Sequence, residues 1–394
     1  MAFVNPFGQP AQRPAAGGFG VFGGQQAKAA APGADGQATD KYSLAYEIPQ
    51  AAGDTVMSLS FAKTAPLLAA GCWDMCVRVW EIQVQIQPPA LNAIPRREHR
   101  HQAPVLSVAF KDDGTALFSG SCDGEVKALD LQSGNAVTLG KHERGVRHLC
   151  WVEKLQVLIS GGWDKRLGFW QLTGAKEFVD LGERVYAMDV KFPLLLVATA
   201  ERGLYCFDLS SPNPKQPVTQ GLMPQLRFQT RCLSVFTDGK GFVAGSMEGR
   251  CCVFSLPVPP NNQSGGFAFK AHRHQFVQQG GSKSEVVYGV AAIDFHPQSP
   301  GVFATGGGDG GIIFWDKENK SRVRQLDAVG IPVTCVKFNG EGTLIAVAFG
   351  EDWVKGPPIS AAPQAPKIVL GVVTPADVAP KPKPANSGTS PGRR

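Results

Sequence analysis

The sequence has no apolar run that approaches the length of a membrane span, so we expect no transmembrane segment and no membrane partner. Its N-terminal stretch also lacks the basic-then-apolar pattern of a secretory signal peptide. Residues 1–40 contain almost no charge and are rich in Gly, Ala, Gln and Pro. Such a composition cannot bury enough apolar surface to order a chain, so we expect this segment to be disordered.

The motifs of the common catalytic sites are missing as well. The sequence contains no nucleophile elbow, no HExxH motif and no phosphate-binding Gly-rich loop before a helix. Gly306–Gly311 is rich in Gly, but strand-like runs flank it and no Lys follows, so we interpret it as a turn. We predict no catalytic residues. A propeller hydrolase remains the alternative from another class, and it requires an acid/base pair open to solvent.

Metal-ligand spacing is also lacking. Cys72 and Cys76 flank a turn, but no second pair of ligands stands at zinc spacing. His272 and His274 flank Arg273 with no Asp, Glu or Cys nearby at ligand spacing, so we interpret them as part of a basic surface loop. The nine Cys fall mostly within strand-like runs, which indicates reduced core residues. We predict no metal and no cofactor.

The sequence does contain three short β runs between His142 and Leu172. Val146–Val152, Val157–Ser160 and Arg166–Leu172 are separated by tight turns, as a small antiparallel sheet requires. Four side chains with hydrogen-bonding groups recur there at fixed offsets: His142, Ser160, Asp164 and Trp170. The Asp can accept a hydrogen bond from the His, the other His nitrogen can meet the Ser, and the indole N–H then finds a partner. We predict that they form the internal network of one WD40-type propeller blade.

This spacing repeats along the chain. Six acidic residues are each followed, six places later, by an aromatic or large apolar residue: Asp74 and Trp80, Asp123 and Leu129, Asp164 and Trp170, Glu201 and Phe207, Glu248 and Phe254, Asp309 and Trp315. Asp352 begins a seventh copy. The anchors are mostly about 40 residues apart, as in WD40 repeats. We therefore predict an all-β fold, a seven-bladed WD40 β-propeller that forms one domain at residues 41–373, because each blade needs its neighbours.

The segments around the repeats have their own patterns. Tyr42–Ile48 alternates apolar and polar residues, and we expect it to supply the outer strand of the last blade. Gln83–Arg100 is interpreted as an inserted loop that ends in a basic cluster, with a positive rim for acidic peptide or nucleic acid as the alternative. We align His101 with His142 and interpret it as a blade histidine. Residues 374–394 are predicted to be a disordered basic tail.

Several strings of the sequence resemble one family of propellers. They are Gly161–Leu167 with Trp170, Val197–Leu204, Thr230–Cys232, Gly245–Arg250, Phe269–Arg273, Phe295–Pro297, Phe314–Lys317, and Asp352-Trp353 with Lys355-Gly356. On these strings the chain resembles the Rae/Gle-type mRNA export factors, WD40 propellers associated with the nuclear pore. The N-terminal tail fits that family through three dipeptides: Phe7-Gly8, Phe19-Gly20 and Phe22-Gly23. The Gln83–Arg100 segment departs from the family because it is longer than usual.

The resemblance implies a non-enzymatic adaptor or scaffold in mRNA transport. Such propellers bind the GLEBS segment of an FG nucleoporin, and Arg231 matches the position that would hold an acidic residue of that segment. Trp315, Asp316 and Lys317 match a surface patch that partner proteins use, although Trp315 also fits a blade-core position. RNA or an mRNP would be bound through the basic rim. The family implies a propeller that is monomeric within a heteromeric complex, located in the nucleus and at the nuclear pore complex of the nuclear envelope, and shuttling to the cytoplasm.

One other family shares part of these strings. Bub-type spindle-checkpoint propellers have the Glu248–Arg250 and Phe269–Arg273 strings and bind a kinetochore protein's GLEBS segment. The Ala198–Gly203 string, the Asp352–Gly356 string and the FG tail favour the export factor. Binding of the two kinds of GLEBS segment would separate the two hypotheses.

Overall fold

The computed structural model describes residues 46–85, 90–222, 226–256, 266–277, 281–326, 330–351 and 365–379. The chain divides into two units, Met1–Lys41 and Tyr42–Arg394, and every described residue belongs to the second. The FG dipeptides and the predicted seventh anchor, Asp352, lie outside the described residues.

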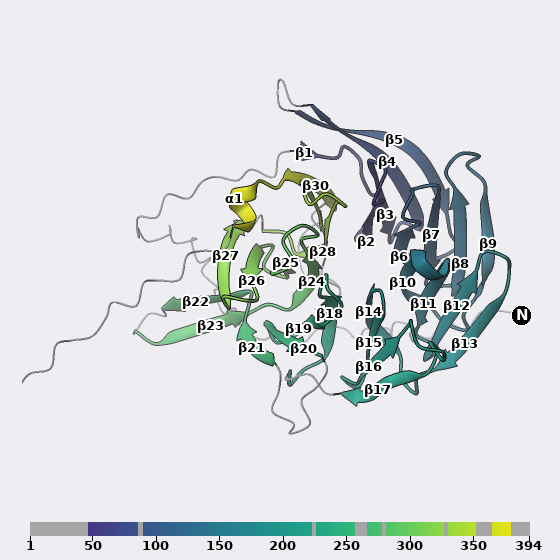
Figure 1. Cartoon of the computed structure of the whole chain (residues 1–394). Coiled ribbons are helices and arrows are strands. Elements are labelled where there is room, and N and C mark those ends of the chain that lie inside the picture. The colour runs from purple at the N-terminus through teal and green to yellow at the C-terminus, as the bar shows by residue number, and fades with distance from the viewer. Residues whose placement is uncertain are drawn as a thin grey trace, which may run out of the picture. The chain divides into compact units, whose positions relative to one another are not determined.

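Seven four-stranded antiparallel sheets, the blades, are arranged around a central channel (Figure 1), as the repeats predict. Blade 1 contains β2 (Val56–Phe61), β3 (Leu67–Cys72), β4 (Cys76–Gln85) and β5 (Ala90–Arg100). Blade 2 contains β6 (Val105–Phe110), β7 (Ala116–Ser121), β8 (Glu125–Asp130) and β9 (Ala136–Lys141). Blade 3 contains β10 (Val146–Val152), β11 (Val157–Gly162), β12 (Arg166–Gln171) and β13 (Lys176–Asp180). Blade 4 contains β14 (Val185–Lys191), β15 (Leu194–Thr199), β16 (Leu204–Asp208) and β17 (Pro217–Leu222).

The remaining blades follow the same order from the channel outward. Blade 5 contains β18 (Thr230–Val235), β19 (Gly241–Ser246), β20 (Arg250–Ser255) and β21 (Gly266–Lys270). Between blades 5 and 6 lies a separate hairpin, β22 (Arg273–Val277) and β23 (Lys283–Val287). Blade 6 contains β24 (Val290–Phe295), β25 (Val302–Gly307), β26 (Ile312–Asp316) and β27 (Ser321–Leu326). Blade 7 contains β28 (Val333–Phe338), β29 (Leu344–Phe349), β30 (Lys367–Val372) and β1 (Tyr46–Glu47).

The first chain segment closes the last blade. β1 pairs antiparallel with β30, with Tyr46 opposite Leu370 and Glu47 opposite Val369. The backbone N–H of Ile48 then donates to the carbonyl of Ile368 at 2.9 Å. The expected role of the Tyr42–Ile48 segment is thus confirmed for its described residues. An open edge on β30 is avoided in this way.

Adjacent blades are joined by apolar packing and by hydrogen bonds between inner strands. The strands are rich in β-branched and aromatic residues, and their buried side chains pack against the next blade, as Phe118 does against Trp151 at 5.2 Å between ring centroids. Ser107 Oγ of blade 2 accepts the backbone N–H of Leu149 in blade 3 at 2.9 Å. The Asp189 carboxylate of blade 4 accepts a hydrogen bond from the backbone N–H of Val235 in blade 5 at 2.8 Å. These bonds satisfy polar groups where two sheets meet.

Two segments differ from the sequence-based prediction. The basic segment before His101, interpreted as a loop, is mostly the outer strand β5, which pairs with β4 along its whole length. Arg96 therefore donates hydrogen bonds to the Glu81 carboxylate, and Arg97 donates to backbone carbonyls of blade 2.

The predicted tail does not begin at residue 374, because a short helix, α1 (Pro375–Val378), follows with a capping box. Its Asp377 is buried and pairs with Arg324 of β27.

Within the described ranges, no helix is long and apolar enough to cross a membrane. No disulfide joins any of the nine cysteines, all of which lie in the described ranges, as the interpretation of reduced thiols requires. Six of them are buried.

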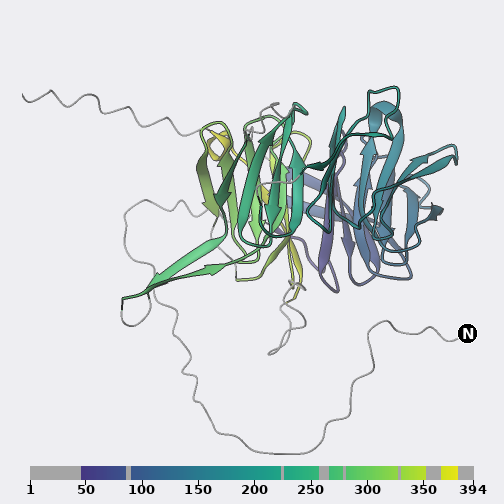
Figure 2. The same cartoon turned by 90° about the horizontal axis from the view of Figure 1, so that it is seen from below.

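We call the face on which the inner strands begin the top face, and the opposite face the bottom face. The connections between blades and the turns between second and third strands lie on the top face, because antiparallel pairing places these ends together. Thr230, for example, pairs with Ser246 at the end of β19. Figure 2 shows the blades edge-on, with the hairpin of β22 and β23 projecting away from the ring.

Candidate functional site

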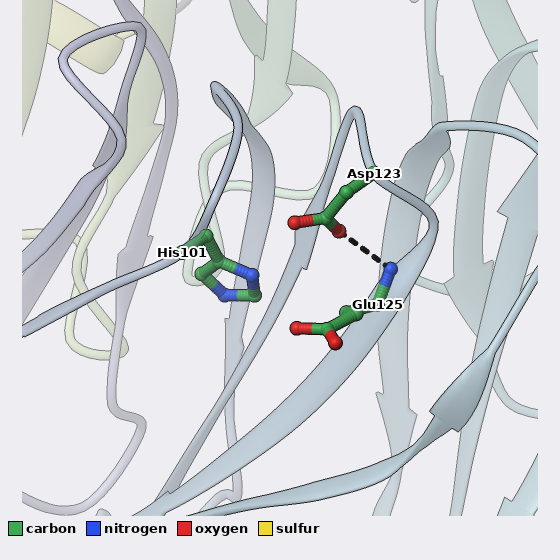
Figure 3. Close-up of side chains that lie close together, drawn as sticks. All are labelled: His101, Asp123 and Glu125. Atoms are coloured by element: carbon green, nitrogen blue, oxygen red, sulfur yellow. Dashed lines mark hydrogen bonds between the residues drawn. The ribbon is translucent and has the colours of Figure 1, made fainter. Parts of the chain in front are cut away.

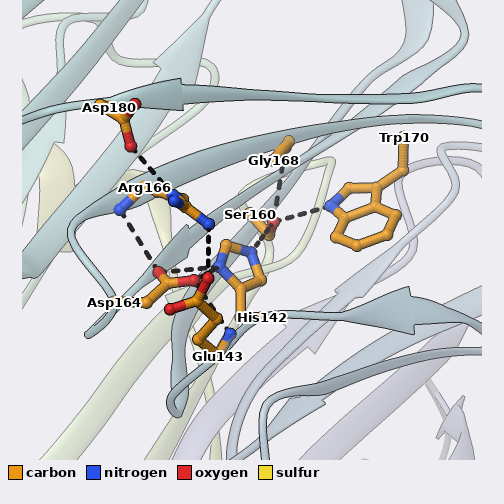
Figure 4. Close-up of polar contacts among 8 residues, drawn as sticks. All are labelled: His142, Glu143, Ser160, Asp164, Arg166, Gly168, Trp170 and Asp180. Atoms are coloured by element: carbon orange, nitrogen blue, oxygen red, sulfur yellow. Dashed lines mark hydrogen bonds and ion pairs between the residues drawn. The ribbon is translucent and has the colours of Figure 1, made fainter.

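The four polar residues singled out in blade 3 lie in one buried network (Figure 4). The Trp170 indole N–H donates to Ser160 Oγ at 2.7 Å, and Ser160 Oγ lies 2.6 Å from His142 Nε2. His142 Nδ1 lies 2.9 Å from both carboxylate oxygens of Asp164. Because the hydroxyl already accepts from the indole, its own proton goes to Nε2, which leaves Nδ1–H to donate to the carboxylate.

The electrostatics of this network favour a charged Asp164. Burial raises the pKa of its carboxyl, but the hydrogen bond and charge of His142 and two backbone N–H groups outweigh burial, so the pKa is lowered overall. The side chains of His142 and Asp164 are 0% and 2% exposed. Although Ser160, His142 and Asp164 are the residue types of a hydrolytic triad, they are closed to solvent. The group therefore stabilises the blade and offers no nucleophile to a substrate.

Blade 6 contains a second complete network, which was not predicted from the sequence. His272 Nδ1 lies 2.9 Å from Asp309, and His272 Nε2 lies 2.9 Å from Thr305 Oγ1. The Trp315 indole N–H donates to that same Thr305 oxygen at 2.9 Å. His272 is therefore a buried blade histidine and does not belong to a surface loop.

A change in spacing explains why His272 was missed. The His and Asp of the network are 22 residues apart in blade 3 and 37 apart in blade 6. The hairpin β22–β23 supplies the extra residues in this region. The offset of ten residues from hydroxyl to tryptophan is the same in both blades, and it would have identified Thr305.

Blade 2 carries an incomplete copy. His101 Nε2 lies 2.8 Å from Ser119 Oγ, but Leu129 occupies the register of Trp170. His99 of β5 takes the free side of the hydroxyl, with its Nε2 3.0 Å from the same oxygen. Burial lowers the pKa of both histidines to about 4, so both rings are neutral at pH 7. A second imidazole thus replaces the missing indole.

At its carboxylate end, the blade 2 network lacks the histidine–aspartate hydrogen bond that blade 3 has. The carboxylate of Asp123 accepts the backbone N–H of Glu125 at 2.8 Å, while His101 Nδ1 and Asp123 Oδ2 have no hydrogen-bond partner. Figure 3 shows the ring of His101 facing the two carboxylates, and one ligand atom from each residue lies within 4.8 Å of the others. These are metal-ligand types. Lys127 Nζ already lies 3.2 Å from Glu125, however, so we interpret the group as an incomplete blade network.

Arg231 lies at the mouth of the central channel on the top face. It is half-buried, and it lines a cavity of about 200 Å³ between the inner strands. Arg147 of blade 3 lines the same cavity. Burial, together with the nearby positive charge of Arg231, lowers the pKa of Arg147 to about 10. Two guanidinium groups in one cavity make this mouth favourable for an anion.

The backbone explains why these arginines occupy the channel mouth. Each of the seven inner strands has a register shift near its start, and the residues at the shift are Met57, Leu106, Arg147, Tyr186, Arg231, Ala291 and Thr334. A bulge turns a side chain away from the regular alternation of the strand. All of these residues except Tyr186 line the channel cavity.

Trp315, Asp316 and Lys317 lie at the opposite end of their blade. Asp316 pairs with Val302 at the start of β25, which places it on the bottom face. Asp316 is buried, and its carboxylate accepts the backbone N–H of Glu318 at 2.8 Å, so it holds a turn. Lys317 Nζ lies 4.6 Å from the ring centroid of Phe236. Arg231 and these three residues are therefore not brought into one site.

A small groove begins beside Lys317 and Lys320 at the bottom face and extends between the outer parts of blades 5 and 6 to Lys270, which pairs with Arg250 near the top face. It has a volume of about 90 Å³ and lies between blades 5 and 6, with aromatic walls formed by Phe267, Phe269, Phe303 and Trp315. Lys270, Lys317 and Lys320 also line it, and Lys320 Nζ lies 4.8 Å from the centroid of Phe267. Only part of this groove is predictable from the sequence, because its residues come from two blades about 50 positions apart in the chain.

Comparison with known proteins agrees with this architecture. Residues 45–81, 95–130, 135–171 and 275–316 match the family described as WD domain, G-beta repeat. Among solved structures, the WD40 β-propeller domain of Doa1 superposes with a TM-score of 0.61 at 18% identity, over 81% of this chain and 93% of that one. This structural likeness supports the fold alone.

Relatives found by sequence are more similar to this chain than the Doa1 domain is. The chain is 39% identical to the poly(A)+ RNA export protein of Schizosaccharomyces pombe, over 86% of this chain and 93% of that protein. It is 37% identical to the mRNA export factor GLE2 of Chaetomium thermophilum, over 84% of this chain and 90% of that one. Protein RAE1 of Arabidopsis thaliana is 35% identical over 82% of this chain and 89% of the plant protein.

Proposed function

Because the chain belongs to the Rae1/Gle2 family of mRNA export factors, we propose that it is an adaptor of nuclear mRNA export that binds an FG nucleoporin through a GLEBS segment. The names of the relatives support a role in mRNA export and hence in nucleocytoplasmic transport. The WD40 propeller family is of a non-catalytic kind, and we propose no enzymatic activity. Its place of action in this proposal is the nuclear pore complex.

The observation that carries the proposal is the cationic mouth of the channel. Arg231 and Arg147 reach one cavity on the top face, where an extended acidic segment can cross the ring. An Arg guanidinium binds a carboxylate with two parallel hydrogen bonds, which fixes the register of the segment as well as its affinity. Desolvation in a half-buried cavity makes such a pair more sensitive to loss of one partner than an exposed pair would be.

The groove on the bottom face supports the second half of the adaptor role. We propose that RNA, or the RNA of an mRNP, contacts the groove of Phe267, Trp315, Lys317 and Lys320. Aromatic rings can stack with unpaired bases and lysines can neutralise phosphates. A partner on the top face and RNA on the bottom face would not compete for the same surface.

The test is affinity purification of the tagged protein followed by mass spectrometry. We expect an FG nucleoporin to be recovered with the wild-type protein and to be lost with Arg231→Glu, because the reversed charge repels an acidic residue. Arg322→Glu is the matched control, since Arg322 is an exposed arginine of the outer strand β27. Recovery of kinetochore proteins without nucleoporins would support the Bub-type checkpoint alternative. Recovery of neither would contradict both functions.

RNA binding is tested separately by ultraviolet crosslinking in cells. Lys317→Glu with Lys320→Glu is expected to reduce crosslinked RNA several-fold, whereas Arg231→Glu leaves it unchanged. Equal crosslinking of the wild-type and double-lysine proteins would contradict the proposed RNA contact.

A further inference from the structure

A cavity of about 490 Å³ lies at the bottom end of the central channel, across blades 1 to 4. Its lining comes from the ends of the inner strands and from the turns that follow them. We call this cavity the bottom chamber. Its apolar walls are formed by Phe61, Phe110, Trp151, Val152, Val190 and Phe192. Cavities of this size with mostly apolar walls are typical of binding sites.

The chamber is open because one position of the inner strands carries small side chains in blades 2 and 3. The position lies four residues after the first residue of each inner strand, and from blade 1 to blade 7 it holds Ser60, Ala109, Cys150, Asp189, Ser234, Asp294 and Lys337. In blades 6 and 7 an ion pair fills this level of the channel, with Lys337 Nζ 2.9 Å from Asp294 Oδ1. Ala109 and Cys150 leave their side of the ring open, and both line the chamber.

The lining of the chamber carries no net charge. Its charged residues are three lysines and three acids: Lys63, Lys154, Lys191, Asp112, Glu153 and Asp189. The carboxylates already have partners. Asp112 accepts from Lys63 Nζ at 2.6 Å, and Glu153 accepts from the Trp151 indole N–H at 2.6 Å. A balanced lining gives neither a phosphate nor a carboxylate an electrostatic advantage. The occupant that fits is therefore an uncharged segment with a large apolar side chain.

The mouth of the chamber offers such a side chain aromatic surface. Phe61, Val190 and Phe192 are half-buried there, and Lys154 Nζ lies 4.7 Å from the ring centroid of Phe192. Trp151 is 7% exposed and forms part of the inner wall. Aromatic rings attract one another in edge-to-face and offset arrangements. A phenylalanine side chain that enters the chamber therefore meets rings that are already in place.

The chain carries such side chains in its own N-terminal segment. Residues 14–27 contain no charged residue, and they include Phe19-Gly20 and Phe22-Gly23. The Gly after each Phe has no side chain to hold the backbone away from a wall. Residues 380–394 at the other end of the chain are a poorer match, because they contain four basic residues and no acidic one. The lysines at the chamber would repel them.

The N-terminal segment joins the propeller on the face where the chamber opens. β1 runs antiparallel to β30, and the last residue of β30, Val372, pairs with Leu344 at the bottom-face end of β29. The chain therefore reaches Tyr46 from the bottom face. Phe22 lies 24 residues before Tyr46, and an unstructured chain of that length spans roughly 25–30 Å. Because packed sheets lie about 10 Å apart, this span reaches from blade 7 to the blades that line the chamber.

We propose that the bottom chamber binds an FG dipeptide of this chain's own N-terminal segment, Phe22-Gly23, with the phenyl ring against Phe61, Val190 and Phe192. The contact tethers the segment to the face opposite the channel mouth. It involves no nucleoporin, so it is tested on the isolated protein. A single aromatic side chain is held weakly and reversibly. The contact therefore leaves the melting temperature unchanged, and FG dipeptides added as free peptide compete with it.

The experiment replaces Phe22 in the full chain with the photocrosslinking amino acid p-benzoylphenylalanine, which keeps an aromatic ring at this position. After irradiation, monomeric protein is isolated and its crosslinked peptides are identified by mass spectrometry. We expect crosslinks to residues of the chamber, and an excess of synthetic peptide 14–27 is expected to reduce them. The matched control carries the same amino acid at Gln26, and its crosslinks to the chamber are expected to be several-fold fewer.

The chamber side of the contact is tested with Phe192→Ser, which is expected to lower the crosslink yield from position 22 several-fold. Leu155→Ser is its control, since Leu155 is 40% exposed in the turn Glu153–Leu155 on the same face and lies outside the chamber lining. Should Phe192→Ser melt below this control, Cys150→Phe replaces it, because the larger side chain fills the chamber from its wall.

Three results would overturn the proposal. The first is an equal yield of chamber crosslinks from positions 22 and 26. The second is a yield that neither Phe192→Ser nor Cys150→Phe reduces. The third is crosslinking only between two chains, which would make a second copy the occupant.

Discussion

At the scale of single residues, two side chains share one buried carboxylate in blade 6. Asp309 meets His272 on one oxygen and His274 on the other. Burial raises its pKa, but the hydrogen bonds and charge of His272, with further help from Gly311 and His274, outweigh burial and bring the pKa down to about 2. The same carboxylate therefore supports the blade network and the hairpin base.

Asp309→Asn is expected to remove a pH-dependent part of the stability. A carboxyl whose folded pKa is depressed stabilises the protein above its unfolded pKa of about 4, and this contribution is lost as the pH falls toward the folded value. The shift from 3.8 to about 2 corresponds to about 2 kcal/mol. Urea unfolding at pH 6 and pH 3 measures it, and the variant is expected to lose less stability between the two values than the wild-type protein.

The control for this prediction is Asp180→Asn. Asp180 is 81% exposed and pairs with Arg166 on the surface, where ion pairs contribute little. If the Asp309 and Asp180 variants show the same pH dependence, the buried network does not hold the carboxylate charge.

The histidine pair of blade 2 predicts a second pH dependence. Burial lowers the folded pKa of His99 and His101 to about 4, below the unfolded value of about 6.5. The unfolded chain therefore takes up protons first, and stability falls as the pH drops from 6.5 toward 4. His99→Gln is expected to reduce the slope of unfolding free energy against pH in this window by about 1.4 kcal/mol per pH unit. An unchanged slope would mean that His99 is protonated in the folded blade.

At the scale of elements, blades 2 and 3 interlock at a glycine. A Cβ on Gly140 of β9 would lie 2.4 Å from the Trp170 ring of blade 3, and Trp170 is 1% exposed. The ring cannot move without breaking its bond to Ser160. The outer strand of one blade thus depends on the network residue of the next.

Gly140→Ala is therefore expected to destabilise the propeller by about 1–3 kcal/mol, the cost of overpacking a filled core. Chemical denaturation measures the change. Gly301→Ala is the matched control, because a Cβ there meets ordinary contacts, the nearest at 3.4 Å. A Gly140 variant as stable as the Gly301 variant would show that the interface between blades 2 and 3 has room for a methyl group.

The strands and turns also show which parts of the fold can be predicted from the sequence. The six-residue offset from acid to aromatic identified the blades, because the turn and third strand have the same length in each repeat. β5 was wrongly predicted as a loop because Pro95 and a run of basic residues resemble one. Pro95 is tolerated there since it lies in an outer strand, opposite Trp80 at a register shift.

The candidate site was less predictable than the blades. Arg231 could be named only by family resemblance, because no local pattern distinguishes an arginine that faces the channel from one that faces water. Arg147 was missed for the same reason. Their proximity arises when strands about 84 positions apart meet around the ring, and it is set by the register shift that each inner strand shares.

At the scale of the whole molecule, the propeller is a ring whose closure depends on a short segment. β1 covers the edge of β30, and Ile48 just after it is 2% exposed, packed in a cluster that joins blades 7 and 1. Each blade buries its faces against two neighbours, so a loss at the closure weakens the ring at the point where its first and last blades meet.

Removal of residues 1–48 is therefore expected to lower the melting temperature by several degrees, whereas removal of residues 1–40 is expected to leave it unchanged. The longer deletion exposes Ile368 and Leu370 and uncovers the backbone of β30. Losing the burial of Ile48 alone costs about 1.5–3 kcal/mol, and an uncovered strand edge also favours association between chains. Calorimetry with light scattering measures both effects. Equal melting temperatures for the two deletions would contradict a stabilising role for β1, and a lowered value for the shorter deletion would place stabilising contacts within the first 40 residues.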